Sequence, residues 1–354
     1  MHARSAIQEL SETHTHGPDT DYRVVRASEK DTRTWLRGSP VCASLSQHRI
    51  AHAGIMTARA PYRIVRMHQG GLYFLACLEG EGRVLVDGAW KKCGAGMAVA
   101  LPPFMVNAFH AVPGKIWRCC WVRYEQQPEQ TPILSSSSPL MAPFAGEALW
   151  NAIEGLVEEA GNAAQPAAMF HWVELVQHYI ERFAQPWQVD DRLHRIWERV
   201  AANVGFDWTL DELARQAHVS TEHLRRLCRK ALGRTPMHHV TWLRMRKAAE
   251  LLSTTNLKIE TISHEVGYQN PFVFSNTFKK WIGWRPSEHR SGNTHEDRGK
   301  DYPGGERLND VPQTRLSVRT TESTSVNPPG ESRESSNAGK TVANVRTHPF
   351  FLPR

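Results

Sequence analysis

Two stretches of this sequence, residues 220–236 (STEHLRRLCRKALGRTP) and residues 270–286 (NPFVFSNTFKKWIGWRP), repeat one pattern fifty residues apart. The segments that precede them also match, at an interval of forty-nine residues. A repeat of this length indicates a duplicated supersecondary unit. The corresponding positions are Leu224 and Phe274, Cys228 and Phe278, Lys230 and Lys280, Gly233 and Gly283, and Pro236 and Pro286.

Each copy predicts a helix, a turn and a second helix. In the first copy, Thr209 and Glu212 have the spacing of a capping box at a helix start. Ser220 is a suitable N-cap for the second helix. Gly233 is expected to end that helix in the left-handed conformation.

The second copy carries the same signals in other residues. Gly267 is expected to form the turn between its helices with a positive φ. Asn270 and Pro271 predict an N-cap followed by proline at the first helical position, where a missing amide costs nothing. Phe274 and Phe278 are expected to face inward.

Residues 240–253 predict an amphipathic helix that joins the two copies. Fourteen residues make a helix of ~21 Å, and packing a unit at each end adds interaxial distances of ~8–10 Å. The second helices of the two copies can then lie near the ~34 Å of one DNA turn, which predicts that both enter consecutive major grooves.

The outward side chains of these two second helices are the predicted DNA contacts. Arginine pairs with guanine and asparagine with adenine, whereas lysines more often contact phosphates. Outward Arg and Lys also occur on ordinary solvated helix faces, and Phe272 is either a core residue or a contact for thymine methyl groups. The predicted contacts are Ser220, Thr221, Glu222, Arg225, Arg226, Arg229, Asn270, Pro271, Phe272, Ser275, Asn276, Lys279 and Lys280.

The distribution of charge favours a polyanionic partner for the duplicated region. The chain has 354 residues and a formal net charge of +7. Residues 206–290 hold fourteen Lys and Arg against eight Asp and Glu, whereas residues 1–190 hold seventeen against eighteen. The basic surplus therefore lies in the duplicated region, and the expected partner is double-stranded DNA.

The N-terminal half predicts many short strands between residues 41 and 124. A strand from Leu72 is expected to enter a turn at residues 79–82 (EGEG), and Asp87-Gly88 is a hairpin signal. Pro102-Pro103 ends a further strand. This pattern indicates a small antiparallel barrel or double-sheet jelly roll, whose concave interior is a candidate small-molecule site.

The segments around these two regions predict less structure. Residues 1–40 are polar and are expected to form a loosely ordered arm, and residues 126–143 are rich in Pro, Ser and Gln and indicate a linker. Between residues 149 and 183, two amphipathic helices either pack within the domain or form a homodimer contact. Residues 291–354 cannot bury enough apolar surface to fold and are expected to be disordered.

Residues across the duplicated region resemble the DNA-binding domain of AraC/XylS-type transcription regulators. The resemblance lies in LDELA (210–214), HLRRL (223–227), LRMRKA (243–248), VGY (266–268), FKK (278–280) and PSEHR (286–290). The order of strands and turns from residue 72 to 124 resembles the cupin-like effector domain of the same family. Cys228 stands where an aromatic residue is usual in that family, and Asn276 where a basic residue is common.

The resemblance implies a homodimeric transcription activator that contacts RNA polymerase and senses a small molecule, with sugars as one class. By similarity to sugar-sensing members, six residues are expected to contact the effector. The alternatives are that Trp117 is a core residue and His110 a structural turn residue. The expected effector-binding residues are Arg66, His68, Tyr73, Asn107, His110 and Trp117.

The residues do not favour a metalloenzyme, which is the alternative function for a cupin fold. The barrel has no His-x-His motif, and the nearest approach to a metal set is His68 with Glu79 or Glu81 and His110. No metal, cofactor or catalytic residue is expected. The six cysteines contain no Cys-x-x-Cys pair and indicate reduced thiols. A signal peptide and an apolar run of ~18 residues are both lacking, so a cytoplasmic protein without a membrane partner is expected.

The sequence thus predicts a two-domain fold: an all-β cupin-like barrel with a helical dimerisation or linker segment, an all-α double helix-turn-helix, and a disordered C-terminal tail. A third possibility is that the barrel serves for dimerisation alone. The expected division is a flexible arm at 1–40, an effector domain at 41–125, a linker and helical pair at 126–188, a DNA-binding domain at 189–290 and a tail at 291–354.

Overall fold

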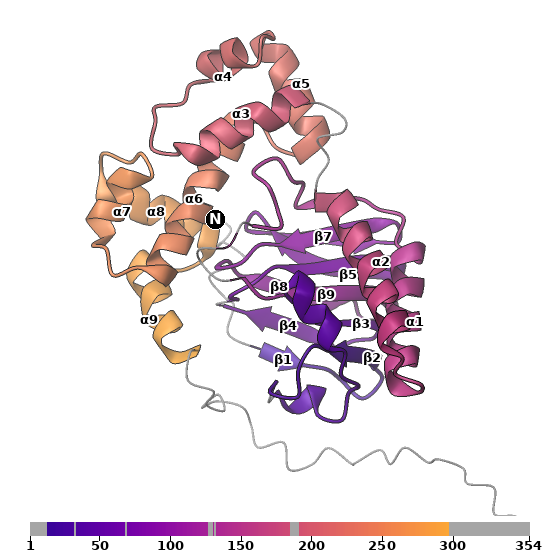
Figure 1. Cartoon of the computed structure of the whole chain (residues 1–354). Helices are drawn as coiled ribbons and strands as arrows, with labels where there is room; N and C mark the ends of the chain where they lie inside the picture. The colour runs from indigo at the N-terminus through magenta and orange to yellow at the C-terminus, as the bar shows by residue number, and fades with distance from the viewer. Residues whose placement is uncertain are drawn as a thin grey trace, which may run out of the picture. The chain divides into compact units, whose positions relative to one another are not determined.

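A curled antiparallel sheet forms the N-terminal half of the chain, and helices form the C-terminal half (Figure 1). The structure is a computed structural model that describes residues 13–31, 33–67, 69–126, 130, 132–184 and 191–296. The curled sheet and the helical region confirm the predicted fold class.

The sheet follows the order β1-β4-β8-β5-β9-β3-β2, with β6 and β7 also paired to β5 and β10 paired to β7. All of these pairings are antiparallel. The strands are β1 (Thr13–Thr15), β2 (Asp21–Arg26), β3 (Ile50–Ala58), β4 (Arg63–Arg66), β5 (Tyr73–Val86), β6 (Ala89–Gly94), β7 (Met97–Leu101), β8 (Asn107–Ala111), β9 (Trp117–Tyr124) and β10 (Met141–Pro143).

Strand β5 curls the sheet into a half-barrel because its two ends pair with different neighbours. Its first part pairs with β7 and β9, and its second part pairs with β6 and β8. The pairing with β9 shifts register between Cys77 and Glu79, and Gly80 follows with a φ of 72°. A Cβ at Gly80 would come within 2.0 Å of the Ile116 carbonyl oxygen. Only glycine fits this bend.

The predicted turn at residues 79–82 is therefore wrong, because β5 passes through it as a bent strand. Hydrogen bonding to β9 and β6 continues across these residues, so the glycines bend the strand without ending it. The other turn signals are confirmed. Asp87 and Gly88 join β5 to β6 with φ values of 55° and 74°, and β7 ends at Leu101 before Pro102.

The described residues between 13 and 40 are ordered, which contradicts the prediction of a loosely ordered arm for this part of 1–40. They include β1, β2 and the 3-10 helix η2 (Thr34–Leu36). Val24, Val25 and Leu36 are buried. A pair of valines between charged residues gives a weak strand signal, and the pairing of β2 with the edge of β3 supplies the missing stabilisation. Residues 1–12 lie outside the described residues.

The predicted linker at 126–143 is also more ordered than expected. Strand β10 pairs with β7, and Leu134, Leu140 and the serines Ser136–Ser138 are buried. The Ser135 amide donates to the Ser138 hydroxyl at 2.9 Å. Short side chains allow this polar segment to be buried, because hydrogen bonds satisfy its polar groups.

Helix α1 (Glu147–Gly161) packs against β2, β3 and β9, and α2 (Pro166–Ala184) packs against α1 and against the 3-10 helix η3 (Ala43–His48). The helical pair thus packs within the domain, which was one of the two expected roles. Phe170 and Leu175 of α2 are 39% and 41% exposed. The homodimer contact stays a prediction.

The C-terminal region has one long buried helix, α6, between two pairs of short helices. Helix α6 contacts α4 and α5 on one side of the repeat and α7, α8 and α9 on the other. Helix α9 continues to Glu296, so the predicted start of the tail, at residue 291, is too early. Residues 297–354 lie outside the described residues. The helices are α3 (Asp191–Ala202), α4 (Leu210–Gln216), α5 (Thr221–Leu232), α6 (Pro236–Thr254), α7 (Ile259–Glu265), α8 (Pro271–Ile282) and α9 (Pro286–Glu296).

Substitutions at Gly267 and Gly233 separate the cost of a positive φ from the cost of steric crowding around an added Cβ. Both have positive φ, 84° and 69°, as predicted. A Cβ at Gly267 would lie 2.8 Å from the Arg244 guanidinium and 2.9 Å from the Gly205 carbonyl, whereas a Cβ at Gly233 would meet nothing within 4 Å. We expect Gly233→Ala to lower the free energy of unfolding by the backbone strain alone, roughly 1–2 kcal/mol. We expect Gly267→Ala to lower it by more, because Arg244 and Gly205 crowd the added Cβ.

Urea unfolding of the full chain, followed by circular dichroism, measures both losses. Equal losses for the two variants would show that the neighbours of Gly267 move away at no cost.

Candidate DNA-binding surface

Side-chain caps set the first residue of the helices that form the candidate surface. The Ser220 hydroxyl accepts from the His223 amide at 3.2 Å, and Asn270 Oδ1 accepts from the amides of Phe272 and Val273 at 2.8 and 3.4 Å. These bonds satisfy amides that have no partner within the helix. The predicted N-caps of α5 and α8 are confirmed.

The predicted capping box at α4 is present only in part. The Thr209 hydroxyl accepts from the Glu212 amide at 3.2 Å. The Glu212 carboxylate, however, accepts from Arg215 at 2.6 Å and from Gln216 at 2.6 Å. Glu212 therefore stabilises the exposed side of α4 in place of the reciprocal half of the box.

Each helix pair is held by a small apolar core. Leu224 and Cys228 of α5 are fully buried, and so are the corresponding Phe274 and Phe278 of α8. The two phenylalanine rings lie 5.7 Å apart. Burial raises the pKa of the Cys228 thiol to about 12, so Cys228 is a neutral, apolar core residue. The core of the first unit therefore has a small side chain, Cys228, where the second unit has the aromatic ring of Phe278.

Helix α5 exposes an arginine-rich face. Arg225 is paired with Glu222 at 3.3 Å, which reduces the charge that both present. Arg226 lies 3.3 Å from His223 Nδ1, and its side chain is exposed. Arg229 is also exposed and has no ion-pair partner among the described residues. Arg226 and Arg229 therefore provide the most available guanidinium groups of α5.

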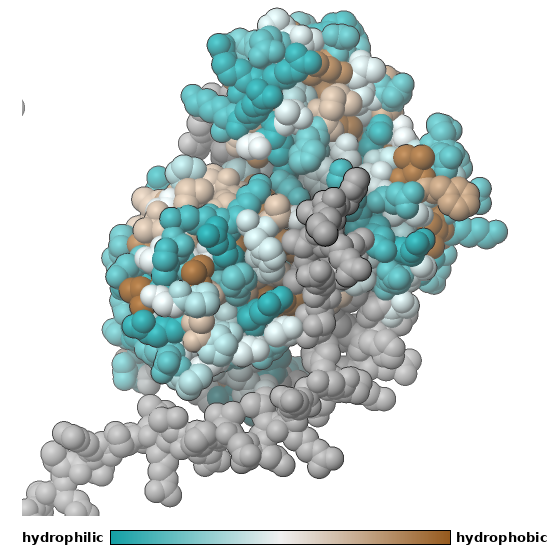
Figure 2. All heavy atoms as spheres, turned by 180° about the vertical axis from the view of Figure 1, so that it is seen from behind, coloured by the Kyte–Doolittle hydropathy of each residue, from teal (hydrophilic) through white to brown (hydrophobic). Residues whose placement is uncertain are grey.

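Helix α8 begins with an exposed apolar pair. Phe272 is 81% exposed and Val273 is 53% exposed. Of the two alternatives for Phe272, the core residue is therefore wrong, and the contact with thymine methyl groups stays a prediction. Sequence reasoning missed Val273, although its position beside Phe272 at the helix start was the available signal. Elsewhere on the face opposite to Figure 1, the described surface is mainly hydrophilic, with hydrophobic residues in small groups (Figure 2).

The remaining predicted contacts lie on the same helices with intermediate or full exposure. Asn276 and Lys280 are exposed, and Ser275 and Lys279 are partly exposed. Contact of these residues with DNA stays a prediction. Thr221 and Pro271, at the starts of α5 and α8, are also partly exposed.

Four of the six residues expected to bind an effector lie near one another in the sheet. Arg66 pairs with Asn107 between β4 and β8, and the rings of Tyr73 and Trp117 both lie against Phe109. Trp117 is fully buried, and the Asn107 amide group donates to the Met105 carbonyl at 2.9 Å. His110 Nδ1 lies 2.9 Å from the Ala111 carbonyl. The Arg66 guanidinium lies over the buried Tyr73 ring, 5.1 Å from its centroid. His68 lies outside the described residues, and effector binding by this set stays a prediction.

The described part of the chain contains neither a membrane-spanning helix nor a metal-binding cluster. None of its helices is both long and apolar enough to cross a membrane. Its His, Cys, Asp and Glu residues form no group of three or more that could hold a metal ion.

A known domain family and a solved structure match the duplicated region. The helix-turn-helix domain family matches residues 213–292, which include the capped helices α5 and α8. These residues form a helix-turn-helix domain of the AraC type. An AraC-type transcriptional regulator from Chromobacterium violaceum, a solved structure, is 26% identical; the match covers 31% of this chain and 97% of that one, with a TM-score of 0.30.

Curated relatives are named as transcription regulators. The lactose operon transcription activator of Staphylococcus xylosus is 30% identical over 138 residues, which cover 37% of this chain and 49% of the relative. The MmsAB operon regulatory protein of Pseudomonas aeruginosa is 25% identical over 244 residues, which cover 65% of this chain and 78% of the relative. The chain thus spans about half the length of the first relative and more of the second.

The Asn270 cap can be tested apart from DNA binding. Asn270→Ala removes the acceptor for two amides, so we expect the free energy of unfolding to fall by about 1 kcal/mol. Asn270→Asp keeps a side-chain acceptor and is the matched control. Thermal unfolding of both variants without DNA measures the effect. An unchanged free energy of unfolding in Asn270→Ala would show that water replaces the cap.

Proposed function

We propose that this protein is a ligand-responsive, sequence-specific DNA-binding transcription regulator that acts as an activator. The observation that carries this proposal is the pair of capped helix-turn-helix units on one buried helix, α6. Each unit exposes side chains suited to DNA on its second helix, α5 or α8. The match of residues 213–292 to the helix-turn-helix family supports the same function.

The length of α6 suits two contacts with one duplex. Its 19 residues make a helix of about 28 Å. With a helix pair packed at each end, α5 and α8 can enter successive major grooves about 34 Å apart. Arg226 and Arg229 then read bases, Lys279 and Lys280 contact phosphates, and Phe272 contacts thymine methyl groups.

The N-terminal half supplies the regulatory signal in this proposal. A small molecule binds in the half-barrel, α1 and α2 contribute to a homodimer, and the DNA-bound protein contacts RNA polymerase. The name of the Staphylococcus xylosus relative, a lactose operon activator, supports a sugar as one class of effector. The protein acts in the cytoplasm and catalyses no reaction.

Gel-shift titration of the full-length protein on DNA from upstream of its own gene tests the proposal. We expect binding to that DNA to be tighter than binding to a scrambled duplex of equal length and composition. Affinity should also fall steeply as salt rises, because phosphate contacts release counterions. Equal affinity for both duplexes would contradict sequence-specific regulation.

Two variants of α5 distinguish base reading from phosphate contact. Arg226→Ala should weaken binding to the specific site by about 1–3 kcal/mol and binding to scrambled DNA by less. Lys230 is an exposed lysine of the same helix, and lysines more often contact phosphates than bases, so the control Lys230→Ala should weaken both by similar amounts. Affinities of both variants on both duplexes, at one salt concentration, measure the difference; an equal loss for Arg226→Ala would make Arg226 a phosphate contact.

A further inference from the structure

The second helices of the two units, α5 and α8, share one frame. Both have 12 residues and end at a left-handed glycine. Their last turns are basic at equivalent positions, Arg229 and Lys230 in α5 and Lys279 and Lys280 in α8. Because the caps, the core positions and the basic ends correspond, both helices present their exposed positions to a partner in the same way.

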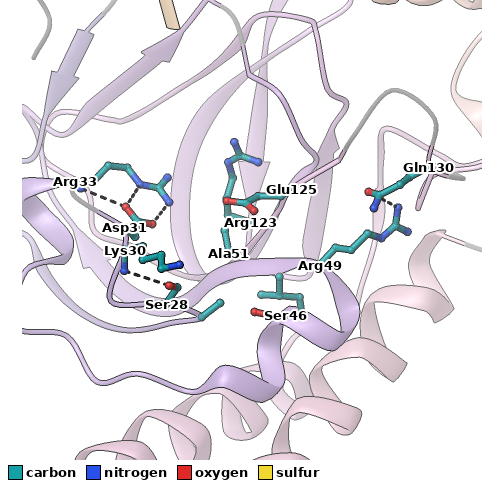
Figure 3. Close-up of a pocket in the computed structure, with 12 residues that line it drawn as sticks. Ser28, Lys30, Asp31, Arg33, Ser46, Arg49, Ala51, Arg123, Glu125 and Gln130 are labelled. Carbon is teal, nitrogen blue, oxygen red and sulfur yellow. Dashed lines mark hydrogen bonds and ion pairs between the residues drawn. The ribbon is translucent and has the colours of Figure 1, made fainter. Parts of the chain in front are cut away.

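The first exposed position of this frame carries different chemistry in the two helices. Glu222 of α5 and Phe272 of α8 occupy it, fifty residues apart. The Glu222 side chain is 77% exposed, and Phe272 is 81% exposed. The cavity of about 600 Å³ in the N-terminal half is lined by no described residue of α5 or α8 (Figure 3). What these helices offer a partner is therefore an exposed face, with a carboxylate on one helix and an aromatic ring on the other.

A second pair of equivalent positions lies four residues further on, on the same helix face. Arg226 of α5 and Asn276 of α8 occupy it, and both are exposed. The Arg226 guanidinium lies 3.3 Å from His223 Nδ1. The equivalent of His223 in α8 is Val273, which is apolar and 53% exposed. Asn276 takes part in no hydrogen bond or ion pair among the described residues, so its side-chain amide is available to a partner.

The two sets of side chains suit different base pairs. A guanidinium binds the O6 and N7 acceptors of guanine, and a carboxylate accepts from the N4 amino group of cytosine. A side-chain amide binds N6 and N7 of adenine, and an aromatic ring contacts the C5 methyl group of thymine. Glu222 with Arg226 therefore matches G·C pairs, and Phe272 with Asn276 matches A·T pairs.

The ion pair between Glu222 and Arg225 leaves Glu222 able to contact a base. The two groups are 3.3 Å apart, and both side chains are exposed. An exposed pair of this kind contributes little free energy. The Glu222 carboxylate can therefore exchange Arg225 for a cytosine amino group.

We propose that the two units read base pairs of different composition, G·C pairs at α5 and A·T pairs at α8. Glu222 and Arg226 read the G·C pairs. Phe272 and Asn276 read the A·T pairs, and Val273 extends the apolar contact. The DNA site is then asymmetric, with its two halves about one DNA turn, or ~10 base pairs, apart. This inference rests on the proposed function, because it concerns the DNA that the same surface binds.

Selection from random duplexes by the full-length protein tests the base composition of the site. We expect G·C pairs to be enriched in one half and A·T pairs in the other. An enriched site without this division would overturn the inference and leave the proposed function standing. Selection that enriches no sequence would remove both.

Base analogues in the selected duplex test the contacts one group at a time. Uracil in place of thymine removes only the C5 methyl group, so it should weaken binding about fourfold for each contacted methyl. 7-Deazaguanine in place of guanine removes the N7 acceptor and should weaken binding about tenfold. Fluorescence anisotropy at one salt concentration measures both losses, and no loss with uracil would overturn the inference.

Phe272→Ala and Arg226→Ala assign these losses to side chains, and each variant is the control for the other. Phe272→Ala should lose the sensitivity to uracil and keep the sensitivity to 7-deazaguanine. Arg226→Ala should show the reverse, because contacts in separate half-sites are independent. Both side chains are exposed, so we expect both variants to fold, and circular dichroism checks this.

Two results from Phe272→Ala would overturn the inference. One is an undiminished sensitivity to uracil. The other is unchanged DNA affinity with a loss of transcription activation in vitro, which would make the exposed ring a contact for a partner protein.

Asn276→Arg gives α8 the residue that α5 has at the equivalent position. A repeated selection with this full-length variant should replace an A·T pair with a G·C pair in one half-site and leave the other half unchanged. This variant keeps the test decisive if Phe272→Ala does not fold. An unchanged site would show that Asn276 reads no base and would overturn the assignment of α8 to A·T pairs.

Discussion

Both helix-turn-helix units depend on the burial of one helix, α6. Its side chains are buried along its whole length and on most of its circumference, including Trp242, Leu243, Met245, Ala249 and Leu252. A helix that is apolar on most sides is stable only when neighbours cover it. Helices α4 and α5 cover one part, and α7, α8 and α9 cover another. The spacing of the two units therefore follows from the length of their shared core helix.

The two units share a fold but present different chemistry. In α5, Glu222 reduces the charge of Arg225, so the face depends on Arg226 and Arg229. In α8, Phe272 and Val273 at the start of the helix are exposed to solvent. Desolvating an apolar side chain favours contact with other apolar groups, whereas a guanidinium favours acceptors on base edges. The duplication therefore preserved the caps and the core while the exposed positions diverged.

In the N-terminal half, the bend of β5 at Gly80 sets the shape that a ligand would meet. It makes one strand part of two surfaces, so the sheet curls. His52 lies on β3, which pairs with β9. The polar groups gathered there have more donors than acceptors. In a protein core, donors without acceptors cost stability.

Local features of the fold followed from the sequence alone: the caps at Ser220 and Asn270, the left-handed glycines at 233 and 267, and the Asp87-Gly88 hairpin. They depend on hydrogen bonds and backbone preferences that act within a few residues. Only the tertiary structure decided that residues 21–26 join the sheet, that β5 passes through its glycines, and that Phe272 is exposed. It also decided that His52 meets Arg33 and Trp121, because burial and strand pairing depend on residues distant in sequence, which local patterns do not encode.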